Sequence, residues 1–122
     1  MESRSKVAIG REGEDQACSF LREKGFEILH RNWRHGHLEI DLIVLRESEL
    51  HMVEVKTRRL GSLRTGEEAV DKNKQKRLLK AANAYAKKFN RTEEISMDVL
   101  VLEYSEEGII RFRLLENAFY PF

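Results

Sequence analysis

Two apolar runs separated by a short polar break constrain the fold of this chain most. The first covers residues 40–45, and the second, residues 50–55, alternates apolar and polar side chains. Both have the length and composition of β-strands, and the polar residues between them supply a turn. A loop of Glu47 and Ser48, or a longer loop over residues 46–49, gives the same register. The pattern therefore predicts a β-hairpin in which Asp41 faces Glu54 and Glu39 faces Lys56.

Three charged side chains of this hairpin suggest chemistry. Asp41 and Glu54 on facing positions would repel each other unless a positive charge lies between them. Lys56 shares the face of Glu54, because side chains alternate along a strand. Carboxylate oxygens suit Mg²⁺ or Mn²⁺, with water and a substrate phosphate as further ligands. The hairpin therefore predicts a divalent-metal site for phosphodiester hydrolysis.

Lys56 has three candidate roles at such a site: it orients the attacking water, deprotonates it, or stabilises the charge that develops on phosphorus. The alternative is a solvated strand face, which is a common reason for a single Glu-x-Lys. Facing acids are rarer, because like charges destabilise a hairpin. The combination of Asp41, Glu54 and Lys56 therefore favours the metal site.

The same residues carry a resemblance. Glu39-Ile40-Asp41, followed after twelve residues by Glu54-Val55-Lys56, resembles the PD-(D/E)xK nuclease motif in the form of the small bacterial YraN-like family, also called UPF0102. Further similar positions are Gly10-Arg11-Glu12-Gly13-Glu14, Ala17, Phe20-Leu21, Gly25-Phe26, Ile28-Leu29, Arg31-Asn32, Glu68-Ala69-Val70, Lys74, Ala82, Tyr85, Met97-Asp98-Val99 and Asn117-Ala118-Phe119. One departure is Leu38, where the family usually has glycine.

The resemblance implies an α/β fold of the restriction-endonuclease-like class: an αβββαβ core, with a mixed sheet flanked by helices and the metal site at one end of its central strands. It also favours Glu14 as a third metal ligand and catalytic carboxylate. The residues alone leave Glu14 open. Helical spacing over 6–24 places it on or near the packed face, where an acid could equally compensate the helix dipole. Gly25 is the expected stop of this helix.

The remaining segments complete one expected domain over residues 1–122. We expect a strand over 26–34, a helix over 67–89 that ends at Asn90 and Arg91, and strands over 95–104 and 109–115. The inward stripe of the second helix is predicted to be Leu78, Ala82, Tyr85 and Phe89. Trp33 is expected to pack at a strand end or to stack on a base. His30 and His51 have no partner evident in the sequence.

Basic residues near the hairpin are candidate nucleic-acid contacts. Charged residues make up 35% of the chain but almost balance, for a net charge of +1, so any attraction to nucleic acid must come from local clusters. The predicted contacts are Arg58, Arg59 and Arg64 after the hairpin and Lys74 on the second helix. The alternatives are a solvated loop and a lysine whose stem packs while its ammonium reaches water.

Other features bear on compartment and assembly. Cys18 is the single cysteine, which excludes an intrachain disulfide, and no apolar run reaches membrane-spanning length, so we expect a cytoplasmic protein with no membrane partner. Cys18 itself fits a core position better than a nucleophile. The apolar ending Ala118–Phe122 is a candidate homodimer contact, or covers the domain's own core.

The first functional hypothesis is a metal-dependent endonuclease that cuts branched or recombination-related DNA, because no segment resembles a base-reading module. An RNA substrate is also compatible with such a site. The alternative is a non-catalytic DNA-binding or adaptor subunit that works with a helicase or recombination partner.

Overall fold

The computed structural model describes residues 6–61 and 72–119. Its elements are α1 (Lys6–Glu23), β1 (Glu27–His35), β2 (Leu38–Arg46), β3 (Glu49–Arg59), α2 (Lys72–Lys88), β4 (Glu94–Ser105) and β5 (Gly108–Leu115). This order confirms the predicted succession of helices and strands. Arg64, residues 67–71 at the predicted start of the second helix, and residues 120–122 lie outside the described residues.

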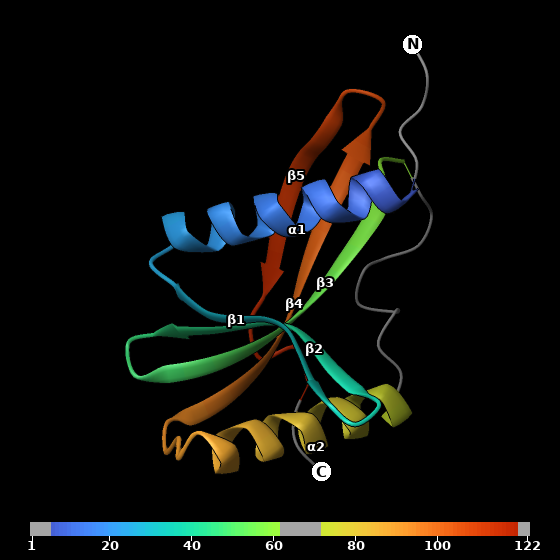
Figure 1. Cartoon of the computed structure of the whole chain (residues 1–122). Coiled ribbons are helices and arrows are strands. Elements are labelled where there is room, and N and C mark those ends of the chain that lie inside the picture. The colour runs from blue at the N-terminus through green and yellow to red at the C-terminus, as the bar shows by residue number, and fades with distance from the viewer. Residues whose placement is uncertain (1–5, 62–71, 120–122) are drawn as a thin grey trace.

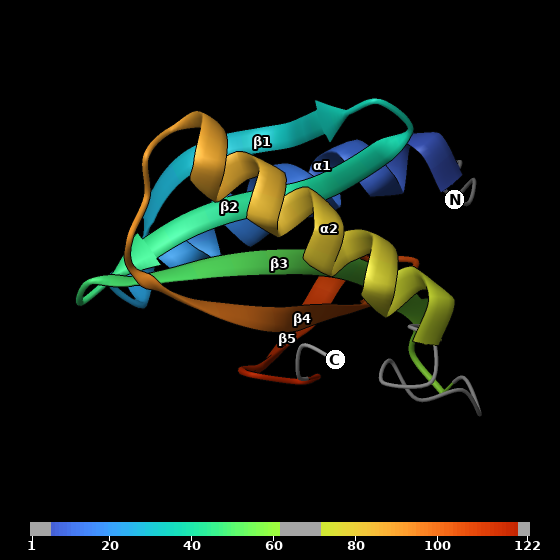
Figure 2. The ribbon, with the colours of Figure 1, turned by 90° about the horizontal axis from the view of Figure 1, so that it is seen from below.

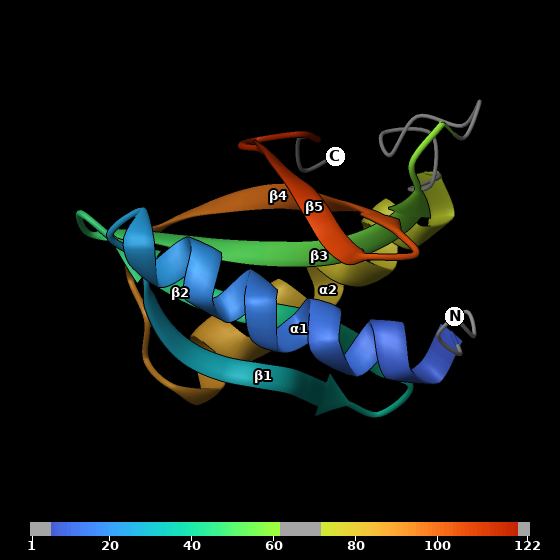
Figure 3. The same cartoon turned by 90° about the horizontal axis from the view of Figure 1, so that it is seen from above.

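The five strands form one sheet in the order β1-β2-β3-β4-β5 (Figure 1). Neighbouring strands are antiparallel except β3 and β4, which run parallel. α2 crosses one face of the sheet (Figure 2), and α1 crosses the other face (Figure 3). The predicted fold class is therefore confirmed: a mixed sheet flanked by helices, with an αβββαβ core and β5 added at the edge.

Two apolar layers hold the helices to the sheet. α1 buries Ala17, Cys18 and Leu21 against one face, and α2 buries Leu78, Ala81, Ala82 and Tyr85 against the other. Cys18 is 1% exposed and burial raises the pKa of its thiol, which confirms the core interpretation. α1 lies close to β3 and β4 at Gly13, where a Cβ would lie 3.4 Å from the side chains of Thr57 and Leu102.

The hairpin between β2 and β3 turns on two residues with left-handed backbone. Glu47 has φ of 50° and Ser48 of 64°, and Arg46 pairs directly with Glu49. A turn with positive φ at both central positions matches the twist of the flanking strands. This selects the shorter of the two predicted loops and confirms the predicted register from Leu42 to Arg46.

Both helices end as predicted. Gly25, with φ of 91°, donates its N–H to the Arg22 carbonyl, and Phe26 donates to the Leu21 carbonyl, each at 3.0 Å. This pair of bonds is the Schellman motif, which satisfies carbonyls at the end of a helix. α2 stops similarly at Asn90, whose φ is 52°.

Aromatic residues beside α2 differ in part from the prediction. Phe89 is 40% exposed, so its predicted place in the inward stripe is wrong, and Ala81 takes a buried position instead. Trp33 packs edge-on against Tyr85, with ring centroids 5.3 Å apart. Phe119 is 7% exposed and joins the core beneath α2, so this part of the C-terminal segment covers the domain itself.

Within the described ranges, no helix is long and apolar enough to cross a membrane.

Candidate functional site

The candidate site forms where β2 and β3 part. Their backbone pairing ends at Leu42 and Val53, so it does not extend to the predicted pairs of Asp41 with Glu54 and Glu39 with Lys56. The Asp41 carboxylate takes over instead, because its Oδ2 accepts a hydrogen bond from the Val55 N–H at 2.8 Å. Glu39 Oε2 lies 3.6 Å from Nη2 of Arg34, its pairing partner on β1. The predicted backbone register is therefore wrong beyond Leu42, because the strands separate there.

The separation opens a pocket of about 320 Å³ beside the N-terminal half of α2. Its lining residues are His37, Leu38, Glu39, Asp41, Glu54, Lys74, Arg77 and Leu78. His37 of the turn between β1 and β2 contributes to this lining together with Lys74 and Arg77 of α2, so the pocket lies between that turn and the helix. The pocket thus brings together Asp41 and Glu54, as the sequence predicted.

The surroundings of Asp41 shift its pKa. Burial, followed by the charge of Glu54, raises its pKa to about 7, although the hydrogen bond from Val55 acts in the opposite direction. The Glu54 side chain is only 9% exposed. Two carboxylates held this close in a desolvated place strain the protein electrostatically when both are ionised, and a cation between them would relieve the repulsion.

Two lysines converge on Glu54. Lys74 Nζ lies 2.7 Å from Glu54 Oε1, and Lys56 Nζ lies 3.4 Å from the same oxygen. Burial and then the neighbouring Lys74 lower the pKa of Lys56. Burial acts to lower the pKa of Lys74 as well, but its contacts with Glu54 outweigh burial and raise it. The sequence predicted that both lysines face this side of the sheet, but not that Lys74 bonds to Glu54.

Glu14 lies elsewhere. It belongs to α1, on the opposite face of the sheet from α2, and does not line the pocket. Its Oε1 accepts hydrogen bonds from Arg31 Nε at 3.0 Å and from Asn32 Nδ2 at 2.7 Å. The hydrogen bonds that Arg31 donates to Asp15 and then to Glu14 raise the pKa of Arg31. Glu14 as a metal ligand stays a prediction, and it would require the carboxylate to leave these partners.

The predicted phosphate contacts after the hairpin are held by acids in this structure. Arg58 Nη2 lies 3.4 Å from Glu103 Oε2, and its side chain is 21% exposed. Arg59 Nη2 lies 3.8 Å from Glu106, with 59% of the side chain exposed. Arg64 lies outside the described residues. Arg58 and Arg59 as nucleic-acid contacts therefore stay predictions, and Arg59 is the more accessible of the two.

The donor set of the pocket fits a hard divalent cation. Asp41 and Glu54 offer carboxylate oxygens from adjacent strands, and Glu39 stands at the rim. Mg²⁺ is usually held by one or two carboxylates together with water and substrate phosphate, so two acids suffice. Among the described residues, His37 is the one histidine in the pocket lining, and no cysteine lines the pocket. The composition favours Mg²⁺ or Mn²⁺.

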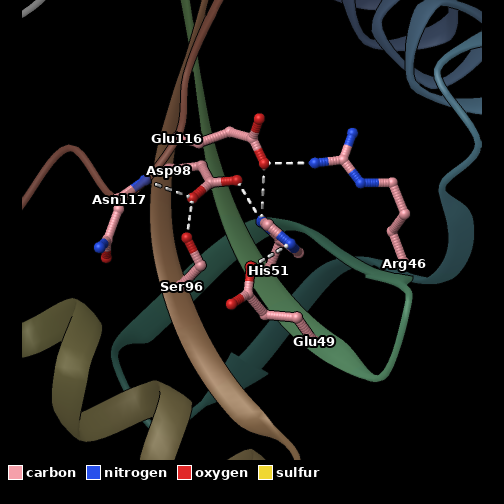
Figure 4. A network of polar contacts seen from close by, with 7 residues as sticks. All are labelled: Arg46, Glu49, His51, Ser96, Asp98, Glu116 and Asn117. Atoms are coloured by element: carbon pink, nitrogen blue, oxygen red, sulfur yellow. Dashed lines mark hydrogen bonds and ion pairs between the residues drawn. The ribbon is translucent and has the colours of Figure 1, made fainter.

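A second polar cluster was missed by sequence reasoning (Figure 4). Asp98, which is fully buried, has Oδ2 2.6 Å from His51 Nδ1, and its Oδ1 accepts hydrogen bonds from Ser96 Oγ and from the Asn117 N–H. Nε2 of His51 lies 2.9 Å from Glu49 Oε1. The one available signal was an acid inside the apolar run 95–104, since a buried carboxylate needs partners.

Part of this cluster could hold a metal ion. Glu49, His51 and Glu116 each offer a ligand atom, and these atoms lie within 4.8 Å of one another. Arg46 already pairs with Glu116, so the group carries a competing cation. The cluster lies on the face of β3 that α1 covers, whereas the Asp41–Glu54 pocket lies beside α2. Residues 6–61 and 72–119 therefore contain two distinct candidate metal groups.

The fold and the pocket define a small α/β protein whose mixed sheet presents two acids and two lysines where its central strands part. The chain belongs to the family described as Uncharacterised protein family UPF0102, which matches residues 13–102. It is 42% identical to a UPF0102 protein of Bacteroides thetaiotaomicron over 113 residues, which cover 93% of each chain. It is 41% identical to a UPF0102 protein of Parabacteroides distasonis, covering 92% of each chain. A Chlorobium phaeobacteroides UPF0102 protein is 40% identical, over 91% of this chain and 93% of its own.

Proposed function

We propose that this chain is a divalent-metal-dependent nuclease that hydrolyses DNA phosphodiesters. The observation that carries the proposal is the pairing of Asp41 with Glu54 in one pocket, with Lys56 and Lys74 at the same carboxylate. A half-buried acid beside a buried one costs folding free energy unless a cation or a proton relieves the repulsion, and an acid with a raised pKa in a cleft is typical of a functional site. A phosphodiester is negatively charged, and a bound cation together with the two lysines would stabilise that charge.

Asp41 and Glu54 would hold Mg²⁺ or Mn²⁺, which supplies Lewis-acid polarisation of a phosphoryl oxygen when bound. Asp41 must be ionised to serve as a ligand, and its raised pKa makes this dependent on pH near neutrality. The hydrogen bond from Val55 fixes the orientation of its carboxylate. These residues therefore set both the position of the cation and the pH range in which it binds.

Lys56 is the candidate general base that activates the attacking water. Its lowered pKa makes a neutral amine more accessible, and a neutral amine can take a proton from the water as the oxygen attacks phosphorus. The P–O bond to the leaving oxygen then breaks, and that oxygen takes a proton from solvent. In its protonated form Lys56 instead stabilises negative charge on the phosphoryl oxygens. Lys74 would turn from Glu54 toward a phosphate.

Branched or recombination-related DNA is the proposed substrate, and RNA is the competing one, since a phosphodiester site of this kind does not itself exclude a 2′-hydroxyl. A helicase or recombination protein as partner and a homodimer as the active form belong to the same proposal. A nuclease with a single site needs a second copy, or a second encounter, to cut both strands of a duplex.

One observation favours a second function. Lys74 neutralises Glu54 at 2.7 Å, so the pocket is partly charge-balanced without a metal. A non-catalytic DNA-binding or adaptor subunit could keep such an ion pair as a structural bond between α2 and β3. The two functions differ in whether Mn²⁺ binds and whether any substrate is cut.

The deciding experiment has two arms. In the first, purified protein is incubated with single-stranded, flapped, forked and four-way DNA, and with an RNA strand, in the presence of each divalent metal. Cleavage that disappears in Asp41→Asn supports the nuclease. Binding without cleavage for every substrate and every metal supports the adaptor.

The second arm measures thermal unfolding with Mn²⁺, because a ligand of the folded state raises the midpoint. Asp41→Asn and Glu49→Gln separate the two candidate metal groups. A shift that Asp41→Asn abolishes and Glu49→Gln retains assigns the ion to the pocket. A shift of equal size in wild type and Asp41→Asn would remove the proposed site.

A further inference from the structure

A second cavity adjoins the acidic pocket. It is an open groove of about 900 Å³ between the turn that joins β1 to β2 and the outer side of α2. Its lining residues are His35, His37, Leu38, Arg77, Lys80, Asn83, Ala84, Lys87 and Lys88. His37, Leu38 and Arg77 also line the acidic pocket, so the two cavities share a wall. A linear ligand could therefore lie in the groove and end at Asp41 and Glu54.

Among the described residues, the charged side chains that line the groove are all cationic. They are Arg77, Lys80, Lys87 and Lys88. Positions 77, 80, 84 and 87 or 88 follow one another at helical spacing, so α2 presents these side chains along one strip. Within the described part of the chain, none of the four is ion-paired with an acid. For a protein with a net charge of only +1, this is a concentrated site for an anionic chain.

The opposite rim and the floor are of another character. Leu38 and Ala84 are half-buried apolar side chains of the lining, and His35 stands at the rim as an exposed ring. The His35 ring stacks on Trp33, with ring centroids 6.0 Å apart and an angle of 6° between the ring planes. Flat rings and apolar floor suit the face of a nucleobase, whereas phosphates need only the cations. The groove thus offers both halves of a nucleotide a matching surface.

We propose that this groove binds an unpaired nucleic-acid strand, with its phosphates along the cations of α2 and its bases against His35 and the apolar floor. The inference rests on the proposed nuclease function and narrows its substrate to nucleic acid with a single-stranded segment that leads into the acidic pocket. A duplex is disfavoured because its bases face inward, so the apolar floor would remain uncovered. A protein that contacts only the phosphates of a duplex would need no more than a flat basic surface.

The first test compares binding of a single-stranded oligonucleotide, as DNA and as RNA, with binding of the blunt duplex of the same sequence. Fluorescence anisotropy in EDTA measures binding without cleavage. The groove variant, Lys80→Glu with Lys87→Glu, reverses two charges of the groove. The control variant, Arg22→Glu with Lys24→Glu, reverses two charges at exposed positions in the last turn of α1 and just after it. We expect the groove variant to lose at least about tenfold in single-strand affinity and the control variant to keep it.

Salt dependence supplies a second readout of the same variants. Each phosphate contact contributes about 0.7 to the slope of log K against log salt for a single strand, so the groove variant should lower the slope by about 1.4. An unchanged slope with an unchanged affinity overturns the proposal. Thermal midpoints of both variants show whether either has lost its fold. If the charge-reversal variant does not fold, the neutral variant Lys80→Gln with Lys87→Gln takes its place.

The base-binding half is tested with His35→Ala and an abasic strand of equal length. If bases lie on the rim, His35→Ala weakens binding of the normal strand but leaves binding of the abasic strand unchanged. Equal losses on both strands, or duplex binding as tight as single-strand binding and equally sensitive to the groove variant, overturn the single-strand assignment.

The outcomes separate this inference from the proposed function. Single-strand binding that depends on the groove, without cleavage of any substrate, keeps the groove and removes the nuclease. Cleavage that depends on Asp41 while the groove variant binds and cuts normally keeps the nuclease and removes the groove.

Discussion

Lys74 Nζ lies 2.7 Å from Glu54 Oε1, so an ammonium from α2 is the direct counter-ion of a carboxylate in the centre of the sheet. The contact fastens α2 to β3 at the pocket. It also means that a divalent cation at Glu54 would have to share this oxygen with Lys74, or displace the lysine toward a phosphate. The ion pair therefore couples the position of α2 to the charge state of the pocket.

Removal of Lys74 should destabilise the metal-free protein. Lys74→Met deprives the nearly buried Glu54 of its closest partner, so we expect the free energy of unfolding in EDTA to fall by about 1–3 kcal/mol. Urea denaturation measures the change. Lys72→Met, at an exposed position of the same helix, is the matched control and should change stability by less than about 0.5 kcal/mol. Equal losses in both variants would show that the ion pair contributes nothing specific.

Stability should depend on pH through Asp41. Its pKa is about 7 in the folded protein against an ordinary 3.8, so between these values the folded state holds a proton that the unfolded chain has lost. The free energy of unfolding should therefore fall as pH rises from about 4 to 7, at most by about 1.4 kcal/mol per pKa unit.

Asp41→Asn tests this directly, because an amide oxygen can still accept the Val55 hydrogen bond but cannot ionise. Urea denaturation in EDTA at pH 5, 6, 7 and 8 should give a shallower pH dependence for the variant, and a more stable variant than wild type at pH 8. Parallel curves for the two proteins would contradict the assignment.

The sequence predicted what depends on neighbours along the chain. The hairpin register near Glu47 and Ser48 and the stop at Gly25 follow from local backbone rules, and the structure confirms both. The meeting of Asp41 and Glu54 followed from that register, although the strands part just before the pair. Local rules fix a turn but say nothing of where a strand pair opens.

What escaped prediction depends on the docking of distant elements. The bond between Lys74 and Glu54 requires the position of α2 over β3, and His51 meets Asp98 across 47 residues of sequence. Alternation placed each side chain on a face of a strand or helix, but no spacing rule connects one element to another. The sequence also gave His51 no visible partner, because its partner lies in an apolar run.

Lys56 should matter for rate more than for affinity. Its Nζ lies 3.4 Å from Glu54 Oε1, beside the proposed cation, where charge develops during hydrolysis. Lys56→Met is expected to cut at least about a hundredfold more slowly at saturating DNA, with a modest loss of affinity. Single-turnover kinetics measures both quantities.

Arg59→Met is the matched comparison, since Arg59 is exposed and predicted to contact only phosphate. It should weaken binding and lower the salt slope by about one, with an unchanged rate at saturation. A normal saturated rate in Lys56→Met would instead make Lys56 a phosphate anchor.

The buried cluster around Asp98 should contribute strongly to stability. Asp98 is fully buried and interacts with Ser96, His51 and the Asn117 N–H, so Asp98→Asn replaces one oxygen of a group with several bonds by an NH₂ that can only donate. We expect a loss of about 2–4 kcal/mol in urea denaturation. Glu49→Gln, on a side chain 44% exposed, should cost less than about 1 kcal/mol. Similar small losses would show that the cluster is incidental.

The parallel pairing of β3 with β4 has a consequence for how the molecule is made. Glu49 pairs with Glu94 and Arg59 with Tyr104, so β3 and β4 can pair only when the intervening segment, which contains α2, forms a loop between them. Loop closure of this kind slows folding, whereas the hairpins of β1 to β3 can form from local contacts. Lys74 reaches Glu54 only once that long-range closure has docked α2. Folding kinetics should therefore place the assembly of the pocket after the formation of these hairpins.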